Sequence, residues 1–210
     1  MTLPGGQSPI LHALDEPTRL LVRLSAVVTS GSEGDQRVAV AAASGIVPDL
    51  WVEELLLQSY LFAGFPRTLN AMREWRREHP EPVAPPAEGT PAEWRTDGER
   101  TCAIVYGQFY ERLRENIRHL HVALDDWMIV EGYGKVLSRP GLDLVRRELC
   151  IVAACAAAGQ DRQLHSHLHG ARNAGAGDEA IAACLDALDD LISKERLATA
   201  RLLWARVRGK

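Results

Sequence analysis

Apolar residues recur at helical spacing along almost the whole chain, and this periodicity limits the fold more than any other feature of the sequence. They return every three or four residues, whereas runs of alternating β-branched residues between turn signals are almost absent. Glycine and proline separate the periodic segments. The pattern predicts an all-α protein, with helices over residues 17–30, 35–44, 48–62, 66–78, 99–118, 122–132, 143–158, 161–175, 178–191 and 194–207.

A proline-rich segment divides the helical sequence in two. Five prolines lie among acidic residues between Glu78 and Gly98, a composition that favours extended backbone. We therefore expect a linker over residues 79–98, between an N-terminal unit of residues 1–78 and a C-terminal unit of residues 99–210.

The two units show faint similarity to one another. Each has a helix, a glycine break, a second helix that ends at glycine, and a third helix. In order and spacing, Arg19, Leu21 and Gly31 correspond to Arg147, Leu149 and Gly159. We interpret the units as divergent tandem repeats. Because Leu20 stands where the second unit has Glu148, a site built on that glutamate would occur once per chain.

Charge and hydropathy argue against several classes of partner. The chain carries 24 Lys and Arg against 28 Asp and Glu, whereas nucleic-acid-binding proteins usually present a clearly basic face. The longest apolar run, residues 149–158, is too short for a membrane span, which needs ~20 residues. The N-terminus lacks the features of a signal peptide. We expect a cytoplasmic protein with no nucleic-acid or membrane partner.

The cysteines and two neighbouring histidines do not have the spacing of a metal site. The four cysteines form no C-x-x-C pair, so we expect reduced, partly buried thiols. Cys155 is interpreted as a small core residue, with a redox role as the alternative. His165 and His169 are four residues apart, but Arg162 shares their side of the helix and no third ligand is in view. We expect a solvated face there and no metal.

Two polar residues interrupt apolar helix faces in the C-terminal unit. At about 100° per residue, Glu148 falls on the apolar stripe of helix 143–158 with Leu144 and Cys155. A buried carboxylate needs a partner, and His167 is the histidine that faces inward on the next helix. Because the connection between the helices is short, they should pack antiparallel and could bring the two side chains together.

This carboxylate and imidazole allow two interpretations. A structural pair would satisfy itself in the core, whereas a proton relay would use the imidazole, oriented by the carboxylate, to transfer protons at neutral pH. Gln160 and Gln163 fall on the same face as His167 and would add amide groups to the pocket. The aromatic segment 60–66 is interpreted as core and subunit packing.

Three segments resemble the carboxymuconolactone decarboxylase family, which includes the alkylhydroperoxidase D-like proteins. They are residues 54–70, 131–144 and 147–175, and the last is the most specific because it contains His167-Leu-His-Gly-Ala-Arg-Asn-Ala-Gly. The resemblance implies an alkylhydroperoxidase D-like helical fold whose subunits assemble as trimers or hexamers. For a chain with two family units, we expect a homotrimer.

The peroxidase branch of this family has a glutamate, a C-x-x-C pair and a histidine. In this sequence their spacing falls on Glu148, Gln160, Gln163 and His167, so both cysteines are missing. Without a thiolate and a resolving thiol, the peroxidase cycle has no nucleophile. The decarboxylase branch also lacks the cysteine pair and keeps the histidine in a similar setting, and it is therefore the nearer analogy.

The resemblance favours a cofactor-independent lyase or isomerase that acts on a small carboxylated or lactone substrate. His167 would move a proton, Glu148 would orient it, and Gln160 and Gln163 would hydrogen-bond the substrate. The candidates for holding a substrate carboxylate are Arg139, Arg147 and Arg172. The alternatives are an alkylhydroperoxidase-like oxidoreductase that uses an unexpected thiol, and a non-catalytic ligand-binding or scaffold oligomer.

Overall fold

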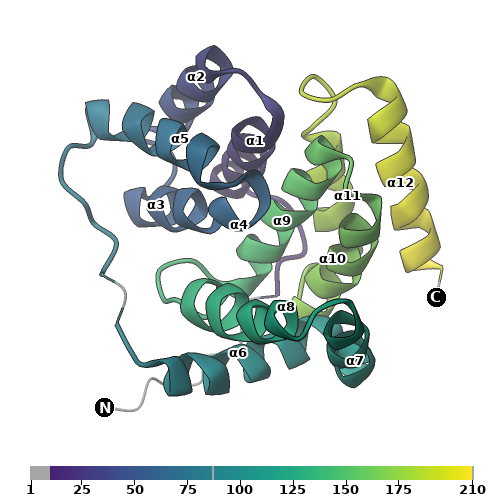
Figure 1. Cartoon of the computed structure of the whole chain (residues 1–210). Helices are drawn as coiled ribbons and strands as arrows, with labels where there is room; N and C mark the ends of the chain where they lie inside the picture. The colour runs from purple at the N-terminus through teal and green to yellow at the C-terminus, as the bar shows by residue number, and fades with distance from the viewer. Residues whose placement is uncertain (1–9, 87, 210) are drawn as a thin grey trace.

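The computed structural model describes residues 10–86 and 88–209, and within them the protein is all-α with no strand (Figure 1). The helices are α1 (Glu16–Ser30), α2 (Glu33–Ala43), α3 (Asp49–Gln58), α4 (Tyr60–Ala63), α5 (Phe65–Glu78), α6 (Pro91–Tyr106), η1 (Gly107–Phe109), α7 (Tyr110–Leu120), α8 (Val122–Trp127), η2 (Met128–Leu137), α9 (Leu144–Ala158), α10 (Asp161–Ala174), α11 (Asp178–Asp186) and α12 (Lys194–Arg208). The fold class predicted from the periodicity is therefore confirmed.

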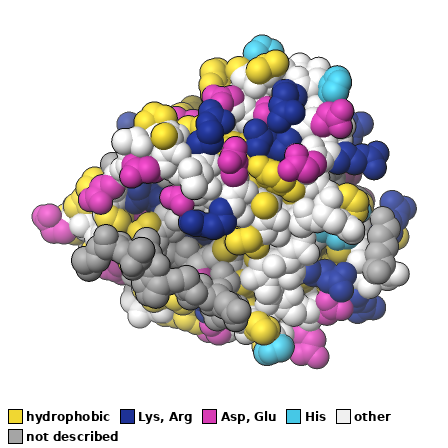
Figure 2. Space-filling model, turned by 90° about the horizontal axis from the view of Figure 1, so that it is seen from below, with side chains coloured by type: hydrophobic (Ala, Val, Ile, Leu, Met, Phe, Trp, Pro, Cys, Tyr) yellow, Lys and Arg dark blue, Asp and Glu magenta, His cyan; other side chains and the backbone are white. Residues whose placement is uncertain are grey.

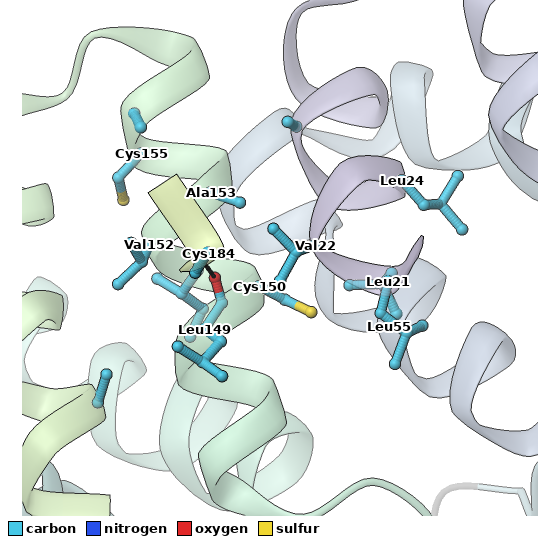
Figure 3. Packing of buried hydrophobic residues seen from close by; sticks show 14 of the residues in the cluster. Leu21, Val22, Leu24, Leu55, Leu149, Cys150, Val152, Ala153, Cys155 and Cys184 are labelled. Carbon is cyan, nitrogen blue, oxygen red and sulfur yellow. Dashed lines mark hydrogen bonds between the residues drawn. The ribbon is translucent and has the colours of Figure 1, made fainter. Parts of the chain in front are cut away.

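Helix α9 lies at the centre of the molecule, between α1 on one side and α10 on the other (Figure 1). All its residues from Val145 to Ala157 are buried, polar ones included. Figure 3 shows Leu149, Cys150 and Val152 of α9 in the same apolar cluster as residues of the N-terminal half, Leu21, Val22 and Leu55. The two halves of the chain thus share one hydrophobic core.

Local caps set the ends of the helices that carry the site. Helix α9 begins after Asp143, whose side chain accepts a hydrogen bond from the Arg146 amide. It ends at Gly159, whose positive φ of 66° is the left-handed conformation that glycine adopts at low cost. The chain therefore reverses at once and enters α10.

The extended segment between the halves is shorter than the predicted linker of residues 79–98. Helix α6 begins at Pro91, because Thr90 and Glu93 form a capping box and proline is well suited to the first turn of a helix. The segment is also tied to the core, since the buried Glu53 carboxylate accepts hydrogen bonds from the amides of Val83 and Ala84.

Helices α6 and η2 pack at unusually close range. A Cβ added at Gly98 would lie 2.1 Å from the carbonyl oxygen of Ile129, and one added at Gly134 would lie 1.9 Å from that of Trp94. η2 is a π-helix, a wide helix type often found at functional sites. It extends the helical region to Leu137, beyond the predicted end at residue 132.

A buried ion-pair network joins the halves beneath the site. Glu54 of α3 accepts hydrogen bonds from Arg139 at 2.9 Å and from Arg147 of α9 at 2.8 Å, and both Glu54 and Arg147 are fully buried. Gln58 also accepts a hydrogen bond from Arg147. Because removing one partner would leave an uncompensated charge in the core, this network fixes α3 against α9.

The surface carries charges of both signs. Figure 2 shows basic and acidic side chains intermixed with hydrophobic ones on the face seen from below. Within the described ranges 10–86 and 88–209, no helix has the length and hydropathy needed to cross a membrane.

Candidate active site

Helices α9 and α10 place Glu148 and His167 opposite one another in the core. Nδ1 of His167 lies 2.8 Å from Oε2 of Glu148, and the two residues are 5% and 0% exposed. The structure thus brings together the two side chains that the sequence analysis expected to face each other. Because a carboxylate can only accept hydrogen bonds, Nδ1 carries a proton when Glu148 is ionised, and in the neutral imidazole Nε2 then presents a lone pair.

Gly170 makes this close approach possible. A Cβ at this position would lie 2.5 Å from Oε2 of Glu148 and 2.7 Å from a methyl carbon of Val105. Both distances are shorter than a van der Waals contact, so any larger residue would displace the carboxylate or separate α10 from α6. The glycine is therefore part of the site.

The second carboxylate oxygen of Glu148 is buried without a partner. Oε1 accepts no hydrogen bond from any described residue, although the side chain has no solvent exposure. A buried acceptor without a partner costs about 1–3 kcal/mol, more when it is charged. A residue that served only stability would not need this cost, so the unpartnered oxygen favours a chemical role for Glu148.

The ring of His167 also lines a cavity of about 520 Å³. The cavity lies among α4, α6, α7, α8, η2 and α10, and apolar side chains form much of its wall: Phe62, Leu113, Ile117, Leu124, Trp127 and Met128. With Nδ1 engaged by Glu148, Nε2 is the ring nitrogen left to meet a molecule in the cavity.

Two tyrosines stand beside His167 in the cavity wall. The rings of Tyr106 and Tyr133 are 6.3 Å apart between centroids, and the Tyr106 ring is 6.4 Å from that of His167. Burial raises the pKa of both phenols above its ordinary value. They therefore stay protonated at neutral pH, and the Tyr106 hydroxyl can donate a hydrogen bond to a ligand oxygen.

The structure separates the two glutamines predicted to bind substrate. Gln163 lines the cavity near its mouth, one helical turn from His167. Gln160 is exposed and does not line the cavity, so its predicted place in the pocket is wrong. The face analysis fails there because Gln160 is the N-cap of α10, with the non-helical angles φ −87° and ψ 67°.

The arginine that lines the cavity is one that the sequence analysis placed on a solvated face. Arg162 lines the cavity, whereas Arg139 and Arg147 bind Glu54 and Arg172 binds the carbonyl oxygen of Val207. None of these three candidates lines the cavity. Arg162 is exposed, as expected for a solvated face, and it lines the cavity as well.

A glutamate also lines the cavity. Glu131 of η2 has the Lys135 ammonium 3.4 Å away, and burial, with a further contribution from the Glu131 charge, raises the pKa of Tyr60. Residues 60–62 of α4 line the cavity as well, so the N-terminal half contributes to the site. The sequence analysis assigned this aromatic segment to packing, since periodicity alone does not distinguish a core wall from a cavity wall.

All four cysteines are buried and unpaired by disulfides. Burial raises the pKa of Cys155 to about 12, with a further contribution from the nearby Glu148 charge. Burial likewise raises the pKa of Cys102 to about 12 and those of Cys150 and Cys184 well above the ordinary value. Such thiols stay protonated at neutral pH and make poor nucleophiles.

His165 and His169 lie beside a second cavity of about 680 Å³, which Arg172 and Asn173 also line. Both histidines are half-buried, and their rings are 5.0 Å apart between centroids. In the part of the chain that the structure describes, no three His, Cys, Asp or Glu side chains form a group that could hold a metal ion.

The protein is thus all-helical, with a buried carboxylate–imidazole pair at the wall of a cavity. The sequence model of the carboxymuconolactone decarboxylase family matches residues 126–206, which include Glu148 and His167. Peroxisomal protein 2 of Schizosaccharomyces pombe is 30% identical over 180 residues, which cover 81% of this chain and 84% of the relative. The chain belongs to the carboxymuconolactone decarboxylase family.

Proposed function

We propose that this protein is a cofactor-independent lyase or isomerase in which His167 transfers a proton at a small carboxylated or lactone substrate. The contact of 2.8 Å between His167 Nδ1 and Glu148 Oε2 carries the proposal, because the same ring lines the cavity. An imidazole oriented by a carboxylate and open to a ligand is the arrangement of a general base.

In the isomerase reaction, Nε2 of His167 accepts a proton from a carbon next to a carbonyl group, and the C–H electron pair moves into an enolate. The imidazolium then returns the proton to another carbon. In the lyase reaction, His167 starts as the imidazolium: a carboxylate leaves as CO₂, its bonding electrons stay on carbon, and the imidazolium protonates that carbon. The neutral imidazole then takes up a proton from water for the next turnover. Glu148 stabilises the imidazolium in either case.

Other residues of the cavity would hold the substrate. Tyr106 would donate a hydrogen bond to the enolate oxygen, where negative charge develops, and Tyr133 would hold the Tyr106 ring in place. Gln163 would hydrogen-bond the substrate near the mouth, and Arg162 would hold a carboxylate there.

The two alternatives have less support. A hydroperoxide reductase needs a thiolate, and the raised pKa values of the buried cysteines disfavour one. A scaffold would need neither an unpartnered buried carboxylate oxygen nor an imidazole in a cavity wall.

The test is an assay of the purified protein against a panel of small lactones, carboxylic acids and organic hydroperoxides in D₂O. NMR would detect deuterium entering the product, together with CO₂ release or ring opening. We expect His167→Gln to lower turnover at least about 100-fold, since general base catalysis contributes ~10²–10⁴. Cys155→Ser, the control, should keep full turnover.

Two outcomes would contradict the proposal. Loss of activity in Cys155→Ser but not in His167→Gln would support thiol chemistry. Full turnover in His167→Gln would remove the imidazole from the mechanism.

We also propose a cytoplasmic location, which the four buried cysteines without disulfides support, because thiols stay reduced in the cytoplasm. The name of the Schizosaccharomyces pombe relative associates that protein with peroxisomes. Imaging of the full chain, tagged internally at the exposed segment 80–82 so that both ends stay free, distinguishes a diffuse from a punctate distribution.

A further inference from the structure

The cavity beside His167 is mainly apolar, which is unexpected for a site that binds a small, highly charged acid. Phe62, Leu113, Ile117, Leu124, Trp127 and Met128 all contribute to its wall. Its volume of about 520 Å³ lies within the range of ~300–1,000 Å³ typical of small-molecule sites. Burial of apolar ligand surface would therefore supply much of the binding free energy.

Helices α7 and α8 form one wall of the cavity and have no hydrophobic core of their own. No residue of α7 is buried, although its apolar side chains Leu113 and Ile117 face the cavity. On the neighbouring segment, Leu124 and Trp127 are 50% and 61% exposed and also line the cavity. A ligand with an apolar body would cover these side chains.

The charges of the cavity lie on its more exposed part. Arg162 is exposed and forms no ion pair with any residue of the described chain, so its charge is available to a ligand. Glu131 is already paired with Lys135. The buried His167 lies five residues further along α10, which corresponds to about 7 Å along the helix axis.

We propose that the site takes an amphipathic monocarboxylate: an apolar aliphatic or alicyclic body of roughly ten carbons, with its carboxylate at Arg162 and its reacting carbon at His167. This inference rests on the proposed function, and it narrows the substrate class. The carboxylate held at the mouth is then retained in the product, so this substrate class fits the isomerase reaction and not decarboxylation. The proton moves at a carbon next to a carbonyl group at the apolar end of the molecule.

A direct test is isothermal titration calorimetry with three unreactive probes. Decanoate has the proposed chemistry, decanol lacks the charge, and cis,cis-muconate is a small dicarboxylate without an apolar body. We expect decanoate to bind with a Kd of about 10–100 µM and at least about thirtyfold tighter than muconate.

Gly132 offers a way to block the cavity. It lines the cavity, a Cβ at this position meets nothing within 4 Å, and its φ lies outside the left-handed region. Gly132→Phe should therefore fill the cavity without straining the backbone and abolish binding of decanoate and decanol. The matched control is Gly34→Phe, at an exposed helical glycine away from this cavity. Circular dichroism checks that both variants are folded. If Gly132→Phe is not folded, Gly132→Leu is used in its place.

Arg162→Gln tests the place of the carboxylate. We expect it to weaken decanoate binding about fivefold, as for a solvent-exposed ion pair, and to leave decanol binding unchanged. Arg206→Gln removes an exposed arginine that does not line the cavity, and it should change neither affinity.

Three results would overturn the inference. The first is no binding of decanoate or decanol at ~1 mM, and the second is binding of muconate as tight as that of decanoate. The third is a combination of two observations: decanoate does not bind the wild type, and an oligomer of the wild type dissociates in Gly132→Phe. A second copy of the chain would then be what covers the apolar wall.

These measurements separate the substrate class from the reaction. If substitutions at Gly132 and Arg162 weaken decanoate binding as expected but no compound turns over, the binding inference stands and the lyase or isomerase proposal fails. If small polar lactones turn over in a His167-dependent way and decanoate does not bind, the proton-transfer function stands and the apolar substrate class is wrong.

Discussion

At the scale of single residues, Glu148 keeps a carboxylate in the protein interior with one of its two oxygens unpartnered. Its one hydrogen bond goes to His167, which in turn lines the cavity. A structural role and a catalytic role for this residue predict opposite effects of removing its charge.

We predict that Glu148→Gln lowers turnover strongly but does not destabilise the fold. The amide can still accept the hydrogen bond from Nδ1, and loss of the buried charge removes a desolvation cost, so unfolding should require up to about 1–2 kcal/mol more. Urea unfolding measures the stability. A loss of more than about 2 kcal/mol would show that the pair stabilises the core and would favour the scaffold alternative.

At the scale of helices, the approach of α6 to η2 depends on two glycines, and the same π-helix contains a third that is free of contacts. Gly134 lies against the carbonyl oxygen of Trp94, whereas a Cβ at Gly132 would meet nothing within 4 Å. The two positions allow a comparison of packing and backbone effects within one segment.

We predict that Gly134→Ala destabilises the protein by about 3 kcal/mol or more, because the added methyl group would force the helices apart. Gly132→Ala should be neutral or stabilising by up to about 1 kcal/mol, since alanine restricts the unfolded chain. Thermal and urea unfolding of both variants measure the difference. Equal effects would contradict the close packing of α6 on η2.

The wall formed by α7 and α8 is held by one buried carboxylate. Asp125 of α8 accepts hydrogen bonds from Arg114 and Arg118 of α7. Hydrogen bonding to Arg114, and then to Arg118, lowers the pKa of Asp125 in the folded protein despite its burial. A lowered folded-state pKa stabilises the protein above the unfolded-state pKa of about 3.9, and this contribution disappears as the pH falls through the folded-state pKa.

We therefore predict that Asp125→Asn costs about 2 kcal/mol at pH 7, and that its difference from wild type shrinks as the pH falls below about 4. Urea midpoints measured between pH 7 and pH 2.5 follow this change. Asp186→Asn, at an exposed ion pair with Arg201, serves as the control and should have little effect at any pH. A constant difference for Asp125→Asn across the range would contradict the linkage.

At the scale of the whole molecule, apolar side chains remain on the surface of one chain. Val38, Ile46, Phe65 and Leu69, in and beside α2, α3 and α5, are each at least half exposed. Oligomer formation is a common way to cover such side chains.

We predict a homotrimer in solution, with the mass of three chains in analytical ultracentrifugation. Replacement of Phe65, which is 63% exposed, by Glu should weaken the assembly if this face forms the interface. Arg37→Glu, at an exposed residue of α2, controls for the change of charge. A stable monomer of the wild type at micromolar concentration would contradict the prediction.

The sequence by itself determined the helical class and the inward direction of Glu148 and His167. Helical period, capping residues and glycine breaks act over a few residues, so they can be read without knowledge of the rest of the chain. The two tandem repeats inferred from the same patterns stay a prediction. Local signals failed at Gln160, where the helix had not yet begun, and at Pro91, which starts a helix instead of extending the linker.

Only the tertiary structure decided what surrounds His167. The cavity wall combines Phe62 of the N-terminal half with Tyr106, Tyr133 and Arg162 from three other elements. Nothing in the local sequence around any of these residues specifies the others, because contacts between distant segments depend on how all the helices pack together. The same packing buried every cysteine, tied Arg147 to Glu54, and left Arg162 as the arginine that faces the cavity.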